Sequence, residues 1–188
     1  VELIDEITAT RLNATGNVIT SSSLSQNTGI TSASATPTSS SNTSSSSSDL
    51  DSHFKEYAES IVKYFKYQRN DKVLDIGSND GLLLSKFATF DLKVLGIDPS
   101  SYVASKATEK GIPTVVSYFN KTAADKLLTE FGAFDLVTAN NVFSHADNLR
   151  EFAECVCSIL SESGAFIFEV SYLKDLVENM VIDYIYHE

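Results

Sequence analysis

The sequence predicts an α/β fold: a Rossmann-like, doubly wound and mainly parallel sheet with helices on both of its faces. Two observations predict it. Short apolar runs alternate along residues 52–188 with segments of helical periodicity, and the first run ends in a glycine-containing turn that opens the next helix. Right-handed crossovers bring the carboxyl ends of parallel strands to one edge of the sheet, so we expect ligand-binding residues directly after the strands.

The first fifty residues differ from the rest in composition. Residues 1–18 are mixed and compatible with a short helix or strand, whereas residues 20–48 are dominated by Ser and Thr and contain no aromatic residue. Such a segment cannot bury enough apolar surface to offset its ordering entropy. We therefore predict that residues 1–50 are a low-complexity, disordered region and that the folded domain spans residues 51–188.

From residue 51 onward, helices and strands are predicted in alternation. The first helix is indicated by the i, i+3, i+4, i+7 spacing of Phe54, Tyr57, Ala58, Ile61, Val62 and Phe65. The apolar run at residues 73–76 then predicts a buried parallel strand. The remaining helices are expected at residues 82–87, 100–111, 122–132, 147–160 and 172–179, with N-caps at Ser100, Thr122 and Asp147. The remaining strands are expected at residues 93–97, 114–118, 134–139 and 165–170.

Composition and charge exclude several classes of partner. The chain carries a formal net charge of −11, has a pI of about 4.6 and shows no basic stripe. Phosphate contacts need clustered Lys and Arg, so we expect no nucleic acid partner. No apolar run approaches the ~20 residues that span a bilayer, and no secretory signal is visible. We expect a cytoplasmic protein that acts on a small molecule, without a membrane partner; the oligomeric state stays open.

The two cysteines predict no metal site. Cys155 and Cys157 lie two positions apart in a helical pattern and therefore point in different directions. We interpret them as one core thiol and one peripheral thiol. A metal site usually needs about four ligands in paired spacing.

The loop after residues 73–76 is the first candidate for ligand binding. Glycines allow the backbone to turn tightly beside a ligand, and the next helix offers free N–H groups and the positive end of its dipole. A dinucleotide fingerprint aligned on Gly77 would need glycine where the chain has Asn79 and Leu82. The S-adenosylmethionine pattern, an acidic residue followed by x-G-x-G-x-G, matches at Asp75, Gly77 and Gly81, with Asn79 in place of the middle glycine. A purely structural glycine turn is the alternative.

An acidic residue at the end of the second predicted strand supports a nucleoside cofactor. Asp98 follows Asp75 by 23 positions (98 − 75). A carboxylate about 20 residues after the glycine loop can accept hydrogen bonds from both ribose hydroxyls. The alternative is that Asp98 only caps the next helix, but Ser100 is available for that role.

These segments resemble a specific family. The stretches at residues 73–81, 96–100 and 139–149 resemble the class I S-adenosylmethionine-dependent core of sugar C-methyltransferases, which act on nucleotide-linked deoxy-keto-sugars. Residues 168–173 fit as well, and Ile185-Tyr186-His187-Glu188 resembles the family's Tyr-His-Glu-His motif. The resemblance covers residues 52–188.

The chain also departs from that family. Its members carry an N-terminal zinc-binding module with several cysteines, where this chain has the Ser-rich stretch without cysteine. They also have a large C-terminal half, and this chain ends before it and before the motif's final His. The resemblance therefore implies a truncated domain that has little or no activity by itself.

The resemblance implies S-adenosylmethionine as cofactor and gives roles to named residues. Cofactor contacts are expected from Asp75, Gly77, Ser78, Asn79, Gly81, Asp98 and Pro99, with Asn140 and Asn141 near the methionine part and Phe119 near the adenine. A catalytic base would remove a proton next to a ketone, and the resulting enolate would attack the methyl group. Tyr186 and Glu188 would orient base and substrate, and His187 is a further candidate. His145 is a second candidate base; alternatively it is a helix-entry residue that bonds the backbone.

Three other functions stay open. A small-molecule O- or N-methyltransferase would share the glycine loop and Asp98 but would not need residues 186–188. A nicotinamide-dependent oxidoreductase is disfavoured by Asn79 and Leu82. A non-catalytic protein that retains affinity for the cofactor is the third alternative.

Overall fold

The computed structural model describes residues 9–12, 18–21 and 45–170, and the side chains from residue 50 onward. Its α-helices are α1 (Ser45–Phe65), α2 (Leu82–Ala88), α3 (Ser101–Glu109), α4 (Lys121–Phe131) and α5 (Leu149–Ile159), and a short 3₁₀ helix, η1, covers Phe143–His145. The strands are β1 (Ala9–Leu12), β2 (Val18–Ser21), β3 (Lys72–Ile76), β4 (Lys93–Asp98), β5 (Thr114–Val116), β6 (Phe134–Asn140) and β7 (Leu160–Glu169). The helix expected at residues 172–179 lies outside the described residues.

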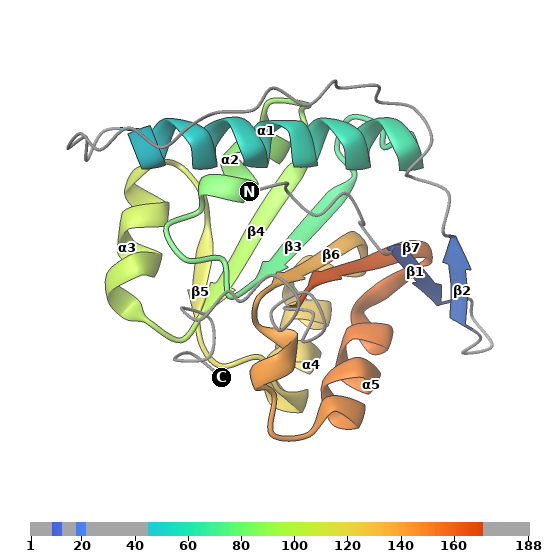
Figure 1. The fold of residues 1–188 in the computed structure, drawn as a ribbon. Coiled ribbons are helices and arrows are strands. Elements are labelled where there is room, and N and C mark those ends of the chain that lie inside the picture. Colours follow the sequence, from blue (N-terminus) through green and yellow to red (C-terminus); the bar gives the residue numbers. More distant parts are fainter. Residues whose placement is uncertain (1–8, 13–17, 22–44, 171–188) are drawn as a thin grey trace, which may run out of the picture.

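The described strands form one 7-stranded sheet in the order β2-β1-β7-β6-β3-β4-β5. From β7 to β5 all neighbours are parallel, while β1 is antiparallel to both β2 and β7. Helices α1, α2 and α3 cover one face and α4 and α5 the other (Figure 1). The predicted doubly wound α/β fold is confirmed.

The order of the strands places a switch point between β3 and β6. From β3 the chain proceeds outward through β4 to β5, and it then returns to the other side of β3 to form β6 and β7. Asp75 of β3 is in register with Thr138 of β6. Ligands of open α/β sheets bind where the strand order reverses, so this part of the carboxyl edge is the place to look for a site.

Alternating side chains of the strands build two cores. Leu74 and Ile76 of β3 pack with Leu127 of α4 and Val156 of α5. Val73, the residue before Leu74, packs on the opposite face with α1 and α2. Continuous apolar runs therefore serve both faces of a buried parallel sheet, which explains why they predicted these strands.

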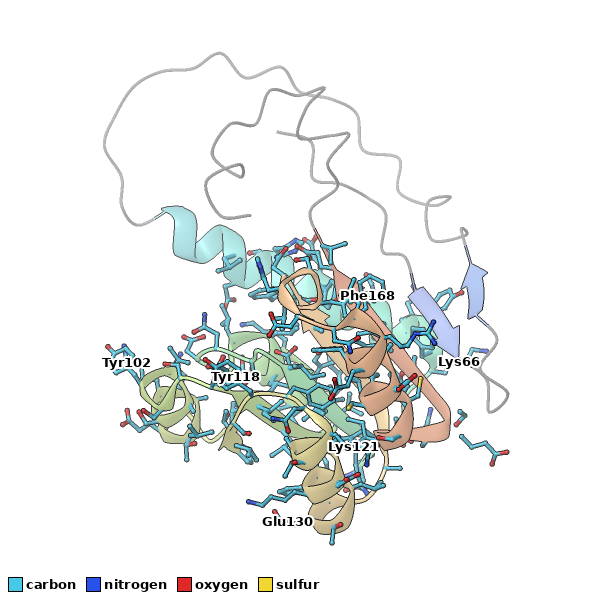
Figure 2. The ribbon with its side chains drawn as sticks, turned by 90° about the horizontal axis from the view of Figure 1, so that it is seen from below. Lys66, Tyr102, Tyr118, Lys121, Glu130 and Phe168 are labelled. Atoms are coloured by element: carbon cyan, nitrogen blue, oxygen red, sulfur yellow. The ribbon has the colours of Figure 1, made fainter. Side chains whose placement is uncertain are left out.

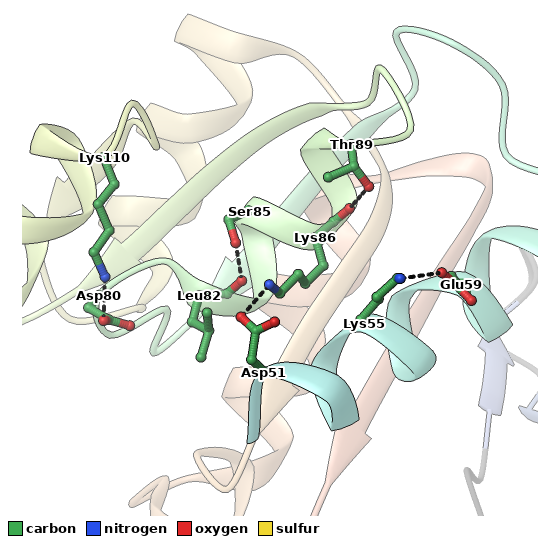
Figure 3. A network of polar contacts seen from close by, with 9 residues as sticks. All are labelled: Asp51, Lys55, Glu59, Asp80, Leu82, Ser85, Lys86, Thr89 and Lys110. Atoms are coloured by element: carbon green, nitrogen blue, oxygen red, sulfur yellow. Dashed lines mark hydrogen bonds and ion pairs between the residues drawn. The ribbon is translucent and has the colours of Figure 1, made fainter. Parts of the chain in front are cut away.

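Helix α1 is fixed to its neighbour by charge as well as by apolar packing. Asp51 Oδ1 and Lys86 Nζ, from α1 and α2, form an ion pair at 2.5 Å, and the Lys86 side chain is 18% exposed (Figure 3). Ala58 and Ile61 of α1 lie in the same core cluster as Phe87 of α2. The apolar face of α1 is thereby held over the sheet.

Parts of the first fifty residues have secondary structure: a short strand lies within residues 1–18, as the sequence allowed, and α1 begins before residue 51. Two short strands, β1 and β2, extend the sheet beyond β7, and α1 begins at Ser45. Sheet pairing satisfies backbone groups without needing an apolar pattern, and a helix once nucleated extends at little cost. The rest of the predicted disordered region, residues 1–8, 13–17 and 22–44, lies outside the described residues.

The helix caps also differ from the prediction. Asn120 and Asn148, not Thr122 and Asp147, cap α4 and α5, and their side chains accept from Ala123 N at 3.0 Å and Glu151 N at 3.2 Å. Ser100 occupies the N-cap position of α3 but makes no side-chain cap bond. Each of these segments offers several competent capping residues, so sequence alone does not select the one used.

The described residues bear on the cysteines, on metal binding and on membrane spans. Cys155 is buried and Cys157 exposed, which confirms the expected core and peripheral thiols. Within the described ranges no group of three His, Cys, Asp or Glu side chains is arranged to hold a metal ion. Of the helices described, none is both long and apolar enough to cross a membrane.

Candidate functional site

The loop after β3 contains three residues in left-handed backbone conformation. Gly77, Asn79 and Gly81 have φ values of 73°, 49° and 76°. Asn adopts this region more readily than other residues with a side chain. The replacement of the middle glycine by Asn79 therefore keeps the backbone shape that the glycine pattern predicts.

Asp98, at the end of β4, organises this loop. Its Oδ2 accepts from Asn79 N at 3.0 Å and its Oδ1 from Ser100 N at 2.8 Å, and the residue is 8% exposed. The Asp98 carboxylate thus holds the glycine loop and also accepts from a backbone N–H at the start of α3, which is part of the capping alternative. Each oxygen has a second lone pair, which leaves capacity to accept from two further hydroxyl groups.

Asp75 is a buried carboxyl group at the switch point. It is 5% exposed, and its Oδ1 accepts from Thr138 Oγ1 at 2.7 Å. Burial raises the pKa of Asp75 to about 7; the Thr138 hydrogen bond opposes this rise and the nearby Asp98 adds to it. No described Lys or Arg contributes to this shift, so the site holds an acid that a cationic ligand would ionise.

The Ser78 side chain does not face the loop's ligand side. Its hydroxyl is buried and has no hydrogen-bond partner among the described atoms. It fills the space where Gly96 of β4 lacks a side chain, since a Cβ built on Gly96 would lie 2.3 Å from Ser78 Oγ. The N–H of Ser78 donates to Ile97 O at 3.3 Å. The predicted contact of Ser78 with a cofactor therefore involves neither its hydroxyl nor its N–H group.

We expect Gly96→Ala to destabilise the protein by about 1–3 kcal/mol, because overpacking forces side chains and backbone apart. The double variant Ser78→Gly/Gly96→Ala removes the two Ser78 atoms that overlap the new Cβ and leaves only Thr114 Oγ1 at 2.9 Å, so it should regain part of that loss. Chemical denaturation of the two single variants and the double variant measures the coupling. Additive effects of the two substitutions would contradict the packing of Ser78 against Gly96.

An ion pair lies beside the start of α2. Asp80 Oδ2 accepts from Lys110 Nζ at 2.6 Å beside the first turn of α2 (Figure 3). This bond lowers the pKa of Asp80, as do weaker hydrogen bonds from the backbone N–H groups of Leu82 and Asp80, against desolvation. The ammonium of Lys110 thus balances the charge of the Asp80 carboxylate at this helix.

At the carboxyl ends of β6 and β7 three polar side chains meet. Asn141, with φ of 54°, donates from its backbone N to Glu169 O at 2.8 Å and from Nδ2 to Glu169 Oε1 at 3.2 Å. The neighbouring Asn140 accepts at Oδ1 from Tyr57 Oη of α1 at 3.2 Å. Sequence reasoning treated Tyr57 only as part of an apolar helix face. The signal was present, because a buried tyrosine hydroxyl needs a polar partner.

The next two predicted site residues are His145, the second candidate base, and Phe119, expected near the adenine. His145 is exposed at the end of η1, and its backbone N donates to Val142 O at 3.1 Å. Phe119 is partly buried and packs on Phe152, with ring centroids 5.0 Å apart. Tyr102 and Tyr118 are 65% and 75% exposed, and Figure 2 shows them on the same side of the molecule.

The structure brings together part of the predicted site. Asp75, Asn79 and Asp98 lie around the ends of β3 and β4, and Asn140 and Asn141 end β6 beside β3. Pro99 is exposed directly after Asp98. Tyr186, His187 and Glu188 lie outside the described residues, so their predicted catalytic roles are not tested.

Comparisons with known proteins agree with this geometry. Residues 50–187 match the family model described as a methyltransferase domain. The C-methyltransferase NovU of Streptomyces niveus is 29% identical over 136 residues, which are 72% of this chain and 32% of that protein. The mitochondrial ubiquinone biosynthesis O-methyltransferase of Homo sapiens is 27% identical over 99 residues, which are 50% of this chain and 27% of that protein.

Solved structures share the fold. The plantazolicin methyltransferase BpumL, crystallised with a pentazolic desmethylPZN analog and SAH, superposes with a TM-score of 0.56 at 18% identity. The match covers 71% of this chain and 54% of that chain. The chain spans 32% and 27% of the lengths of the two curated relatives named above.

Proposed function

The chain belongs to the methyltransferase domain family, and we propose that it binds S-adenosylmethionine at the carboxyl edge of the sheet and donates the methyl group to a small molecule. One observation carries the proposal: the buried Asp75 and the loop-bound Asp98 lie at the ends of adjacent strands beside the switch point. The described residues give Asp75 no cationic partner, and the cofactor bears both an ammonium and a sulfonium.

The residues present fit this cofactor part by part. Asp98 accepts the two ribose hydroxyls, and Asp75 lies toward the ammonium of the methionine part. Gly77, Asn79 and Gly81 keep the loop backbone close to the ligand, and Phe119 and Pro99 lie toward the adenine. Ser78 and the two residues Asn140 and Asn141 complete the proposed contacts. Asn79 and Leu82, which stand where a dinucleotide fingerprint needs glycine, disfavour a dinucleotide in the same place.

We expect the 188-residue chain to bind S-adenosylmethionine in calorimetric titration and not to bind NAD. Asp98→Ala should weaken binding by about tenfold to a hundredfold, because hydrogen bonds to a charged acceptor are worth about 1.5–3 kcal/mol. Asp135→Ala is the matched control: Asp135 also accepts a backbone N–H, that of Lys72 at 2.9 Å, but at the amino end of β6. Its loss should lower stability without changing cofactor affinity.

Thermal unfolding of each variant separates misfolding from loss of binding. If Asp98→Ala does not fold, Asp98→Asn keeps an acceptor for one backbone N–H and removes the charge. A folded wild-type chain that binds NAD, or that binds no S-adenosylmethionine, would show that the site has another ligand.

For the acceptor, we propose carbon methylation of a nucleotide-linked keto-deoxysugar. Support comes from the motif resemblance and from the C-methyltransferase NovU, the first relative described above. Bound S-adenosylmethionine supplies an electrophilic methyl group. A base of the protein removes a proton from the carbon beside the ketone. The enolate electron pair then forms the new carbon–carbon bond while the bond between the methyl group and sulfur breaks, and its electron pair stays on the sulfur of the leaving S-adenosylhomocysteine. Tyr186, His187 and Glu188, with His145 as the second candidate base, are proposed for this proton transfer and for orienting the substrate.

Oxygen methylation is the second candidate. The ubiquinone biosynthesis O-methyltransferase of Homo sapiens is 27% identical over its matched part. An O-methyltransferase would share the Asp98 and Asp75 contacts, but the acceptor hydroxyl would not need an enolate. Incubation with a keto-sugar nucleotide in deuterated water distinguishes them, since enolisation exchanges the hydrogen beside the ketone even when methyl transfer is slow.

A further inference from the structure

A tyrosine from α1 reaches the carboxyl end of β6. Tyr57 is 7% exposed, and its ring lies in the core cluster of α1, α2 and the sheet. Its hydroxyl donates to Asn140 Oδ1 at 3.2 Å, across 83 positions of sequence. We infer that Tyr57 is a positioning residue that turns the Asn140 amide so that its NH₂ group faces the carboxylate of the cofactor's methionine part. The inference rests on the proposed function.

The hydroxyl of Tyr57 keeps its proton. Burial raises the pKa of Tyr57, and the negative charges of Asp75 and Glu169 raise it further, while the Asn140 hydrogen bond opposes the rise. A phenol in this setting is neutral at physiological pH and has one proton to donate. Because that proton lies on the bond to Oδ1, the oxygen end of the Asn140 amide is the end held against α1.

The nitrogen end of the same amide is left for a ligand. An asparagine NH₂ carries two donors, and among the described residues none accepts from Asn140 Nδ2. Asn141 is less suited to this role, because one of its two Nδ2 donors is taken by Glu169 Oε1 at 3.2 Å and the Glu169 carboxylate would repel a ligand carboxylate. Asn140 is only partly buried, at the last position of β6, so a bound molecule can reach its NH₂ group.

The groups around Asn140 indicate that its NH₂ group binds a carboxylate. Asp75 and Asp98 at the ends of β3 and β4 can only accept when ionised, and they complement the ammonium and the hydroxyls of the cofactor. A free α-amino acid end also has a carboxylate, which both aspartates repel. A donor fixed in direction on β6 binds that carboxylate without adding a positive charge beside the sulfonium.

The test compares two ligands and two matched tyrosine variants. S-adenosylhomocysteine and methylthioadenosine are both uncharged at sulfur, and only the first carries the amino-acid end. Tyr57→Phe removes the bond to Asn140 at the carboxyl end of β6. Tyr67→Phe is the control, because Tyr67 Oη donates to Asp135 O at 3.0 Å at the amino end of the same strand. Calorimetry gives affinities, and thermal unfolding gives stability, for both variants of the 188-residue chain.

We expect Tyr57→Phe to bind S-adenosylhomocysteine about tenfold more weakly than wild type, the size of one net hydrogen bond, and to bind methylthioadenosine as wild type does. Tyr67→Phe should bind both ligands like wild type. An equal loss for both ligands, or an equal effect of the two substitutions, would show that Tyr57 is only structural.

Asn140→Asp tests the direction of the amide. A carboxylate at this position should weaken binding of S-adenosylhomocysteine strongly and of methylthioadenosine little, because it replaces a donor with a like charge. Tighter or unchanged binding of S-adenosylhomocysteine would mean that the oxygen of Asn140, not its NH₂ group, faces the ligand, and would overturn the inference. A folded wild-type chain that binds neither ligand overturns the proposed function itself.

Discussion

Replacing Asp75 with asparagine is expected to stabilise the ligand-free protein above pH 7 while abolishing its affinity for S-adenosylmethionine. Burial raises the pKa of Asp75 from 3.8 to about 7, and the carboxyl group has no described cation beside it. Asparagine has the shape of the protonated acid and can accept the same hydrogen bond from Thr138 Oγ1. It lacks the charge that we propose binds the cofactor's ammonium. Removing one partner of a buried ion pair, here the Asp75 carboxylate from its proposed pair with the ammonium, costs about 3–5 kcal/mol.

The sign of the pH dependence follows from proton uptake. Between pH 3.8 and about 7 the folded protein holds a proton on Asp75 that the unfolded chain has released. Native-state stability therefore falls as pH rises through this window, by up to about 4 kcal/mol, and this contribution is constant above it. In Asp75→Asn this fall is absent, so the variant should gain on wild type as pH rises and keep its advantage at pH 8.

Urea denaturation of both proteins at pH 5, 6, 7 and 8, with calorimetry at pH 8, measures the two effects. Saturating S-adenosylmethionine should remove the advantage of the variant, because only wild type binds it. Stability curves that run parallel between pH 5 and 8 would show that Asp75 titrates normally. Retained cofactor binding by Asp75→Asn would show that its charge is not used.

The central sheet and the ligand loop were predictable because their signals are local. Val73 to Ile76 are all buried, as the apolar run requires, and Gly77 and Gly81 have the positive φ that their spacing implies. Asn79 fits the same logic, because asparagine tolerates the left-handed region. Asp98 was recognisable because an acid at the end of the second strand of such a sheet has a fixed place relative to the loop.

What the sequence did not predict depends on residues far apart in the chain. Strand β1 pairs with β7, and β2 pairs with β1. The orientation of Ser78 depends on the missing side chain of Gly96 in the next strand. The bond between Tyr57 and Asn140 likewise joins elements 83 positions apart. Periodicity predicted which face of α1 is buried, but not that the Tyr57 hydroxyl on this face reaches the end of β6.

Gly77→Ala should both destabilise the protein and disrupt the site, because two separate effects coincide at this glycine. Its φ is +73°, and a Cβ built on it would lie 2.4 Å from Val142 Cγ2. The left-handed backbone costs about 1–2 kcal/mol with a side chain, and overpacking adds about 1–3 kcal/mol. Val142 follows Asn140 and Asn141, so its displacement moves the end of β6 as well. We expect a loss of S-adenosylmethionine affinity along with the lower stability.

Two further variants separate the effects. Gly111→Ala introduces the same side chain at a φ of +85° with nothing within 4 Å of the new Cβ, so it should show the backbone cost alone. Val142→Ala in the Gly77→Ala background removes both methyl groups that face the new Cβ and should restore stability to about the level of Gly111→Ala. If Gly77→Ala costs no more than Gly111→Ala in urea denaturation and binds the cofactor normally, the loops after β3 and β6 do not pack as a unit. If Val142→Ala restores stability but not binding, the loop's backbone conformation, rather than its contact with Val142, is what the cofactor requires.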